Sequence, residues 1–191
     1  MMPSLTERTL RLCATREDHQ VAHMAALAIA LSLAEAALPS PLPGVKPGLA
    51  NIVTLMVLLR HGWRMAAWVS VLRVVAGSML LGSFLSPGFV LSAGGALASI
   101  AALSLTIRLP PPWFGPVTHS VVAAFAHIAM QLAIVYFWLI PHAALLRLSP
   151  LFALAALVFG SVNGVVAARL LAGDAPPGAM TGTGDPRTIL R

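Results

Sequence analysis

This 191-residue sequence has little charge and almost no cysteine. Charged residues make up 9% of the chain against 58% hydrophobic residues, a balance too apolar for a soluble domain of this size, which indicates an integral membrane protein. The single cysteine, Cys13, excludes an intrachain disulfide framework and a multi-cysteine metal site. The twelve Lys and Arg residues are scattered between apolar runs, so the net charge of +6 does not indicate a nucleic-acid-binding surface.

Several catalytic motifs are also missing. Without a G-x-x-x-x-G-K-[ST] loop the chain cannot hydrolyse ATP by the P-loop route, and neither a nucleophile elbow nor a zinc-protease motif occurs. Enzymes that elongate prenyl diphosphates need magnesium held by clustered carboxylates. Of the six acidic residues here, only Glu35 lies within an apolar segment. We therefore expect no catalytic carboxylate cluster, no metal site and no cofactor.

Apolar segments dominate what is present. They lie at about 21–38, 48–59, 64–83, 88–107, 115–140 and 150–171. Segments of this length and composition predict an all-α fold, a polytopic bundle of six transmembrane helices. The division that follows is a polar cytoplasmic leader (1–19), one membrane domain (20–171) and a disordered cytoplasmic tail (172–191). A signal peptide is the less favoured interpretation of the first run, because Glu35 would fall in its cleavage region.

The second segment is shorter than the others. About a dozen helical residues cover roughly 18 Å, less than a bilayer's hydrocarbon core. The segment follows Pro47, a residue suited to a first helical turn. A short helix introduced by Pro and Gly inside a bundle is typical of a binding site in membrane proteins. We expect the preceding loop, 39–47, to be a re-entrant loop or lid.

The Lys and Arg residues predict the orientation of the chain. If both termini are cytoplasmic, only Lys46 and Arg147 lie on the outer side and Arg73 lies inside a span. The other nine fall on the inner side: Arg8, Arg11, Arg16, Arg60, Arg64, Arg108, Arg169, Arg187 and Arg191. This asymmetry predicts a multi-pass protein of the bacterial inner membrane whose 39–47 loop faces outward.

Arg73 is the most informative single residue. It lies about ten residues into the third segment, where an unpaired arginine is costly and must face the bundle interior with a partner. Glu35, the only acid in any span, is the candidate partner. The pair either fixes helix packing or, with Arg73 contributing its charge, forms part of an anion site.

A second set of candidates surrounds the start of the short helix. Lys46, Gly48 and Asn51 flank the backbone N–H groups that lack helical partners and carry the positive end of the helix dipole. Such a turn can bind a carboxylate, a phosphate or a carbonyl group. Alternatively, Lys46 extends to the lipid headgroups and Asn51 hydrogen-bonds a neighbouring helix.

Two further polar residues, His127 and Gln131, share one face of the fifth segment. They are either ligand-binding groups or hydrogen-bond partners of another helix. A metal site is a poor interpretation of His127, because no second ligand stands at a suitable spacing. Asn163, among small residues in the last segment, is expected to hold helices together.

Several motifs occur in an order that resembles a known family. They are PGVKPGLAN (43–51), RVVAGS (73–78), LSAGGALAS (91–99), AHIAMQ (126–131) and the Gly-rich last span. Over residues 21–171 the chain resembles the family called Gx transporter or heptaprenyl diphosphate synthase component I. That family is similar to the substrate-binding S components of energy-coupling-factor transporters, six-helix bundles with an outward loop that gates the ligand. The sequence departs from the family pattern at Pro47 and Ile128.

Two functions follow as expectations. The first is an S-component-like uptake subunit that binds a small molecule through Glu35, Lys46, Gly48, Asn51, Arg73, His127 and Gln131 and works with an energy-coupling membrane protein and an ATPase. The alternative is a non-catalytic membrane component of polyprenyl diphosphate synthesis that binds an isoprenoid and works with a soluble prenyltransferase. Both place the protein among membrane lipids, and neither involves nucleic acid.

Overall fold

The computed structural model describes residues 15–37, 48–109, 114–142 and 144–173, and every regular element within these ranges is helical. The principal helices are α1 (Arg16–Ala37), α2 (Leu49–His61), α3 (Trp63–Leu80), α4 (Pro87–Thr106), α5 (Pro116–Ile134) and α7 (Ser149–Gly173). A five-residue π-helix, η1 (Val135–Leu139), continues α5, and a single turn, α6 (Ala144–Arg147), precedes α7. The all-α class is confirmed, and each expected apolar segment contains one principal helix.

Four of these helices are long and apolar enough to cross a membrane: α1, α4, α5 with η1, and α7. At 13 residues, α2 is the short helix that the sequence predicts. The count of six spans remains a prediction, because length and composition support four. The expected loop at 39–47 and the tail from 174 onward lie outside the described residues.

The first helix begins earlier than the apolar run. The Asp18 N–H donates to the Thr15 hydroxyl at 3.2 Å, and the Thr15 N–H donates to the Asp18 carboxylate at 2.8 Å. This reciprocal pair is a capping box, which satisfies backbone donors that a helix start leaves free. The helix therefore extends one turn into the segment that the sequence assigns to the polar leader (1–19).

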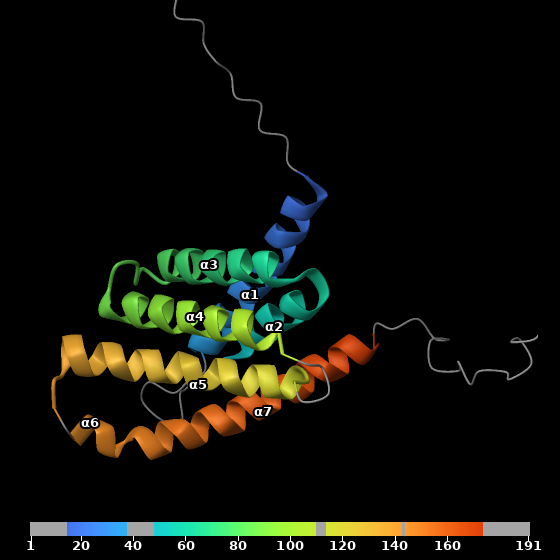
Figure 1. The fold of residues 1–191 in the computed structure, drawn as a ribbon. Coiled ribbons are helices and arrows are strands. Elements are labelled where there is room, and N and C mark those ends of the chain that lie inside the picture. Colours follow the sequence, from blue (N-terminus) through green and yellow to red (C-terminus); the bar gives the residue numbers. More distant parts are fainter. Residues whose placement is uncertain (1–14, 38–47, 110–113, 143, 174–191) are drawn as a thin grey trace, which may run out of the picture.

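The helices form one bundle around the short helix. Figure 1 shows α3, α4, α5 and α7 roughly aligned in a row, with α1 and α2 behind them. Helix α2 packs against α1, α3, α5 and α7. Its side chains are apolar nearly all round, and Val57 and Leu58 are fully buried. A helix of this kind belongs in a core, which is why α2 lies in the middle of the bundle despite its length.

The last helix shows how the bundle is arranged with respect to lipid. Its buried face consists of small or polar residues, Ala156, Gly160, Asn163, Gly164 and Ala167. Its other faces expose large apolar residues such as Leu154, Leu157, Val158 and Val162. Small residues inside and large apolar residues outside are the pattern of helices packed within a membrane.

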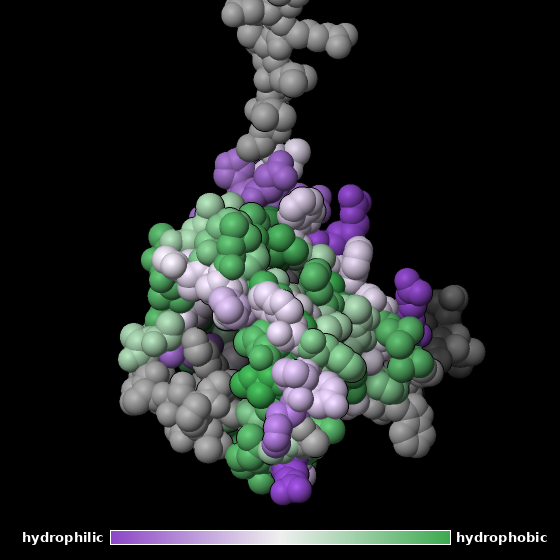
Figure 2. All heavy atoms as spheres, turned by 90° about the vertical axis from the view of Figure 1, so that its left-hand side faces the viewer, coloured by the Kyte–Doolittle hydropathy of each residue, from purple (hydrophilic) through white to green (hydrophobic). Residues whose placement is uncertain are grey.

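The end of the bundle at the α3–α4 turn also exposes apolar residues. Figure 2 looks at the end where α3 turns into α4, and hydrophobic residues cover much of it, with strongly hydrophilic residues at the upper and lower margins. The ends of a membrane bundle face headgroups and water, so the evidence for a membrane protein is the four long apolar helices and the large apolar side chains exposed along them.

Helices α5 and α7 approach each other closely at Gly164. A Cβ atom there would lie 2.6 Å from the Cα of Val117 and 3.0 Å from the Cβ of Ser120. We expect Gly164→Ala to push the two helices apart at a cost of about 1–3 kcal/mol. Thermal unfolding in detergent should therefore show a lower Tm. Gly173→Ala, in the same helix but with no atom within 4 Å of its Cβ, is the matched control; equal Tm values for both variants would contradict the packing.

Candidate functional site at the start of the buried short helix

Three helices meet at Gly48, the residue before α2. Its N–H donates to the carboxylate of Glu35 in α1. Its carbonyl accepts from the Asn51 N–H at 2.8 Å and from the Asn163 side-chain amide of α7 at 3.2 Å. The backbone at Gly48 is left-handed, with φ at 73°, a conformation that favours glycine. The expectation that Asn163 holds helices together is confirmed.

Glu35 satisfies a need that the burial of α2 creates. The start of a helix carries unpaired N–H groups and the positive end of its dipole, and inside a bundle these groups need acceptors from the protein or from bound water. Glu35 is 7% exposed, and its carboxylate lies at this point. It therefore occupies the position at which the sequence predicts a ligand anion, so the Gly48 N–H already has its partner.

The expected pairing of Glu35 with Arg73 takes a different form. The two side chains are close enough to attract each other electrostatically, but no ion pair within 4 Å joins them among the described residues. The Nε atom of Arg73 is buried and has no hydrogen-bond partner among the described residues. The residue as a whole keeps intermediate exposure. Because buried polar groups are almost always hydrogen-bonded, an unpartnered Nε at this position is unusual.

His127 and Gln131 both face α4. The His127 ring lies over Gly95, where a Cβ would come within 2.7 Å of it, and its Nδ1 is 3.4 Å from the Ser99 hydroxyl. The side-chain amide of Gln131 is 3.5 Å from the Leu91 carbonyl. Arg73 also lies within electrostatic range of His127. His127 thus contacts a hydroxyl of another helix, as one of its two interpretations predicts, while a ligand role for either residue stays a prediction.

The structure thus brings together most of the predicted site residues. Glu35, Gly48 and Asn51 meet at the start of α2, and Arg73 is in electrostatic range of both Glu35 and His127. Gln131 is one turn further along α5. Lys46 lies outside the described residues, and its role remains a prediction.

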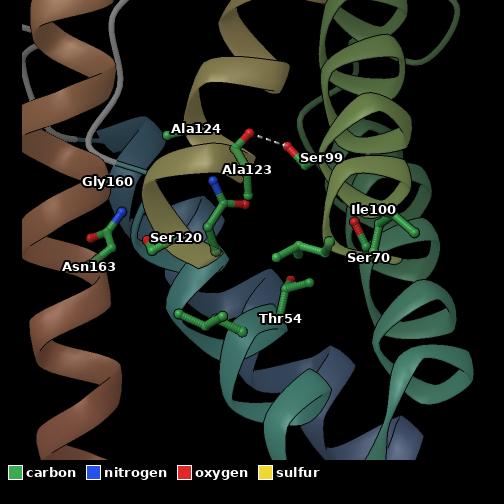
Figure 3. A pocket seen from close by; sticks show the side chains of 12 residues that line it. Thr54, Ser70, Ser99, Ile100, Ser120, Ala123, Ala124, Gly160 and Asn163 are labelled. Carbon is green, nitrogen blue, oxygen red and sulfur yellow. Dashed lines mark hydrogen bonds between the residues drawn. The ribbon is translucent and has the colours of Figure 1, made fainter. Parts of the chain in front are cut away.

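Sequence reasoning missed a polar cavity beside this site. It measures about 30 Å³ and is lined by polar side chains from five helices. Figure 3 shows five of them around the cavity, Thr54, Ser70, Ser99, Ser120 and Asn163, and Asn51 also lines it. Ser99 donates to the Ala123 carbonyl at 2.9 Å. A cavity of this size has room for roughly one or two water molecules.

Two hydroxyls in the cavity have no partner among the described residues. Ser70 is 2% exposed and Ser120 is 8% exposed, and neither side chain forms a hydrogen bond there. Isolated serines in apolar helices give no periodic signal, so only their burial on facing helices identifies them. Their hydroxyls add polar groups to a cavity that Leu55, Ile100 and Leu103 also line.

The contact between Glu35 and Gly48 can be tested directly. We expect Glu35→Ala to leave the Gly48 N–H unpaired, at a cost of about 1–3 kcal/mol, and to speed hydrogen exchange at the start of α2. Glu35→Gln, which keeps an acceptor oxygen, should fall between this variant and the wild type. Glu17→Ala removes an exposed acid from the same helix and is the control. Equal exchange rates in the Glu35 and Glu17 alanine variants would exclude the contact.

Comparison with known protein families gives one match for this chain. Residues 24–170 match the family model described as heptaprenyl diphosphate synthase component I. No curated protein and no solved structure matches the chain. The match covers all the principal helices from the middle of α1 almost to the end of α7. The chain is therefore a member of the heptaprenyl diphosphate synthase component I family.

Proposed function

We propose that this protein is the non-catalytic membrane component of a polyprenyl diphosphate synthase and that it binds the anionic head of an isoprenoid diphosphate. The family name, a component of heptaprenyl diphosphate synthase, supports this function better than a transporter subunit. The observation that carries the proposal is the buried, unpartnered Nε of Arg73. An arginine in a helix bundle that lacks a direct acid partner is suited to a phosphate ligand.

The surroundings of Arg73 favour an anion from outside the chain. Glu35 attracts the guanidinium, but its carboxylate is already hydrogen-bonded to Gly48. Arginine binds phosphate oxygens through several parallel N–H groups, and each such bond is stronger than one between neutral groups. His127, which is in electrostatic range of Arg73, and Lys46, which precedes α2 in the sequence, are the further residues that we assign to the head group.

We assign the catalytic step, elongation of the prenyl chain, to a partner protein. Prenyl elongation requires carboxylates that hold magnesium, and no group of three His, Cys, Asp or Glu side chains occurs in the part of the chain that the structure describes. We propose that a soluble prenyltransferase supplies these carboxylates and that the membrane component holds the amphiphilic substrate or product.

The basic end of the bundle is the proposed docking side for that partner. Arg60 at the end of α2, Arg64 at the start of α3 and Arg108 after α4 belong to the ends that Figure 1 shows opposite the α3–α4 turn. Arg169 lies near the same end, in the last turns of α7. With this end cytoplasmic, both termini and a soluble synthase share one compartment, in agreement with the positive-inside rule.

A transporter subunit is the second candidate. The polar cavity at the start of the short helix supports it, because discontinuous helices often border substrate sites in carriers. Purification from the native membrane separates the two functions. A co-purifying prenyltransferase supports the synthase component, whereas an ATPase together with a coupling membrane protein supports the S-component-like role.

Arg73→Ala tests the head-group site. We expect isoprenoid diphosphate retained through purification in mild detergent, and measured by mass spectrometry, to fall about tenfold or more, because a charge-assisted hydrogen bond contributes about 1.5–3 kcal/mol. Arg147→Ala, which removes an exposed arginine away from the proposed docking end, should retain the wild-type amount. Unchanged retention in Arg73→Ala would overturn the proposed site, and a polar solute lost instead of an isoprenoid would favour the transporter.

A further inference from the structure

A groove of about 350 Å³ runs along the outside of the bundle between α3 and α4. Trp63, Val71 and Val74 of α3 and Phe89 and Leu97 of α4 form its walls. Its floor includes small residues, among them Ala67 and Ala93, where larger side chains would fill the space between the helices. The lining is almost wholly apolar, and the volume is typical of ligand pockets.

We infer that this groove binds the hydrocarbon chain of a single isoprenoid diphosphate, whose head lies near Arg73. The inference rests on the proposed function, which supplies the head-group site, and adds the place of the chain and the side from which it enters. The chain enters laterally, from the bilayer between α3 and α4, and not through the end of the bundle.

Two residues connect the groove with the interior. Ser70 and Ile100 line both the groove and the polar cavity, so the two hollows approach each other at these side chains. Arg73 lines neither hollow, but it lies one turn after Ser70, roughly 4.5 Å along α3, and directly precedes Val74 in the groove lining. An amphiphile with its chain in the groove would pass Ser70 to bring its negative head to the guanidinium.

The charge of Arg73 and its position along α3 indicate which kind of ligand suits the groove. The arginine is the eleventh residue of the 18 in α3, about 15 Å from the start of the helix. A phospholipid keeps its head at the membrane surface, whereas a head bound to Arg73 must lie well within the bilayer if α3 spans it as the sequence predicts. A single-chain diphosphate suits this geometry because its charge complements Arg73 and its chain continues into an apolar channel.

Filling the groove tests the inference. Ala67→Trp and Ala93→Trp each place a large side chain on the floor, and Ala101→Trp, on the exposed side of α4, is the matched control. With farnesyl diphosphate as the probe, we expect about tenfold weaker binding in the first two variants, since several buried methylene groups are displaced. Binding of inorganic diphosphate, which has no chain, should be unchanged in all three.

The outcomes separate this inference from the proposed function. Equal farnesyl diphosphate binding in the floor variants and in Ala101→Trp would overturn the groove while leaving the head site intact. Inorganic diphosphate binding that is insensitive to Arg73→Ala would instead overturn the proposed function.

Cysteine labelling provides a second test, which does not depend on whether the tryptophan variants fold. The background for this test is Cys13→Ser. The variants Val71→Cys and Leu97→Cys, in the groove, and Ala101→Cys, outside it, are each labelled with a membrane-permeant maleimide. We expect farnesyl diphosphate to slow labelling about fivefold or more at Val71 and Leu97 and not at Ala101, because a buried thiol is inaccessible. Equal protection by a phosphatidylglycerol would identify an ordinary lipid groove and contradict the inference.

Discussion

The hydrogen bonds of Gly48 are the constraint on which the rest of the structure depends. A 13-residue helix packed among four others begins just after Gly48, whose N–H and carbonyl both form hydrogen bonds to protein atoms. Glu35 accepts the Gly48 N–H, and Asn163 donates to the Gly48 carbonyl from a position 115 residues further along the chain. These contacts join α1, α2 and α7 and hold the centre of the bundle in one arrangement.

The position of Glu35 explains the state of Arg73. Since the carboxylate bonds to the helix start, it attracts the guanidinium from a distance and forms no close ion pair with it. The protein thus contains a partly compensated cation at mid-helix depth, with its Nε sealed and unpartnered. A pair in direct contact would stabilise the bundle but leave less positive charge for a ligand. The structural and the proposed binding roles of these residues are therefore linked through one hydrogen bond.

The distribution of side chains divides the bundle into three environments. Large apolar residues face outward, small residues lie where α5 and α7 touch, and hydroxyl and amide groups line the centre. At Ser70 and Ile100 the outer and inner environments come within one side chain of each other. A membrane component that holds an amphiphile needs such a boundary, because its ligand combines a charged head with a hydrocarbon chain. The catalytic carboxylates can then belong to a soluble partner.

The sequence alone determined the helical class, the six apolar segments, the short helix after Pro47 and the family, because hydropathy, segment length and motif order are local properties of the chain. It also identified Glu35, Arg73 and Asn163, since a polar group in an apolar run is conspicuous. Only the tertiary structure decided that Glu35 bonds to Gly48 and not to Arg73, and that Ser70 and Ser120 converge on one cavity. Those outcomes depend on how each helix is rotated and which side chains it turns toward its neighbours, and a single sequence does not specify the rotation of one helix against another.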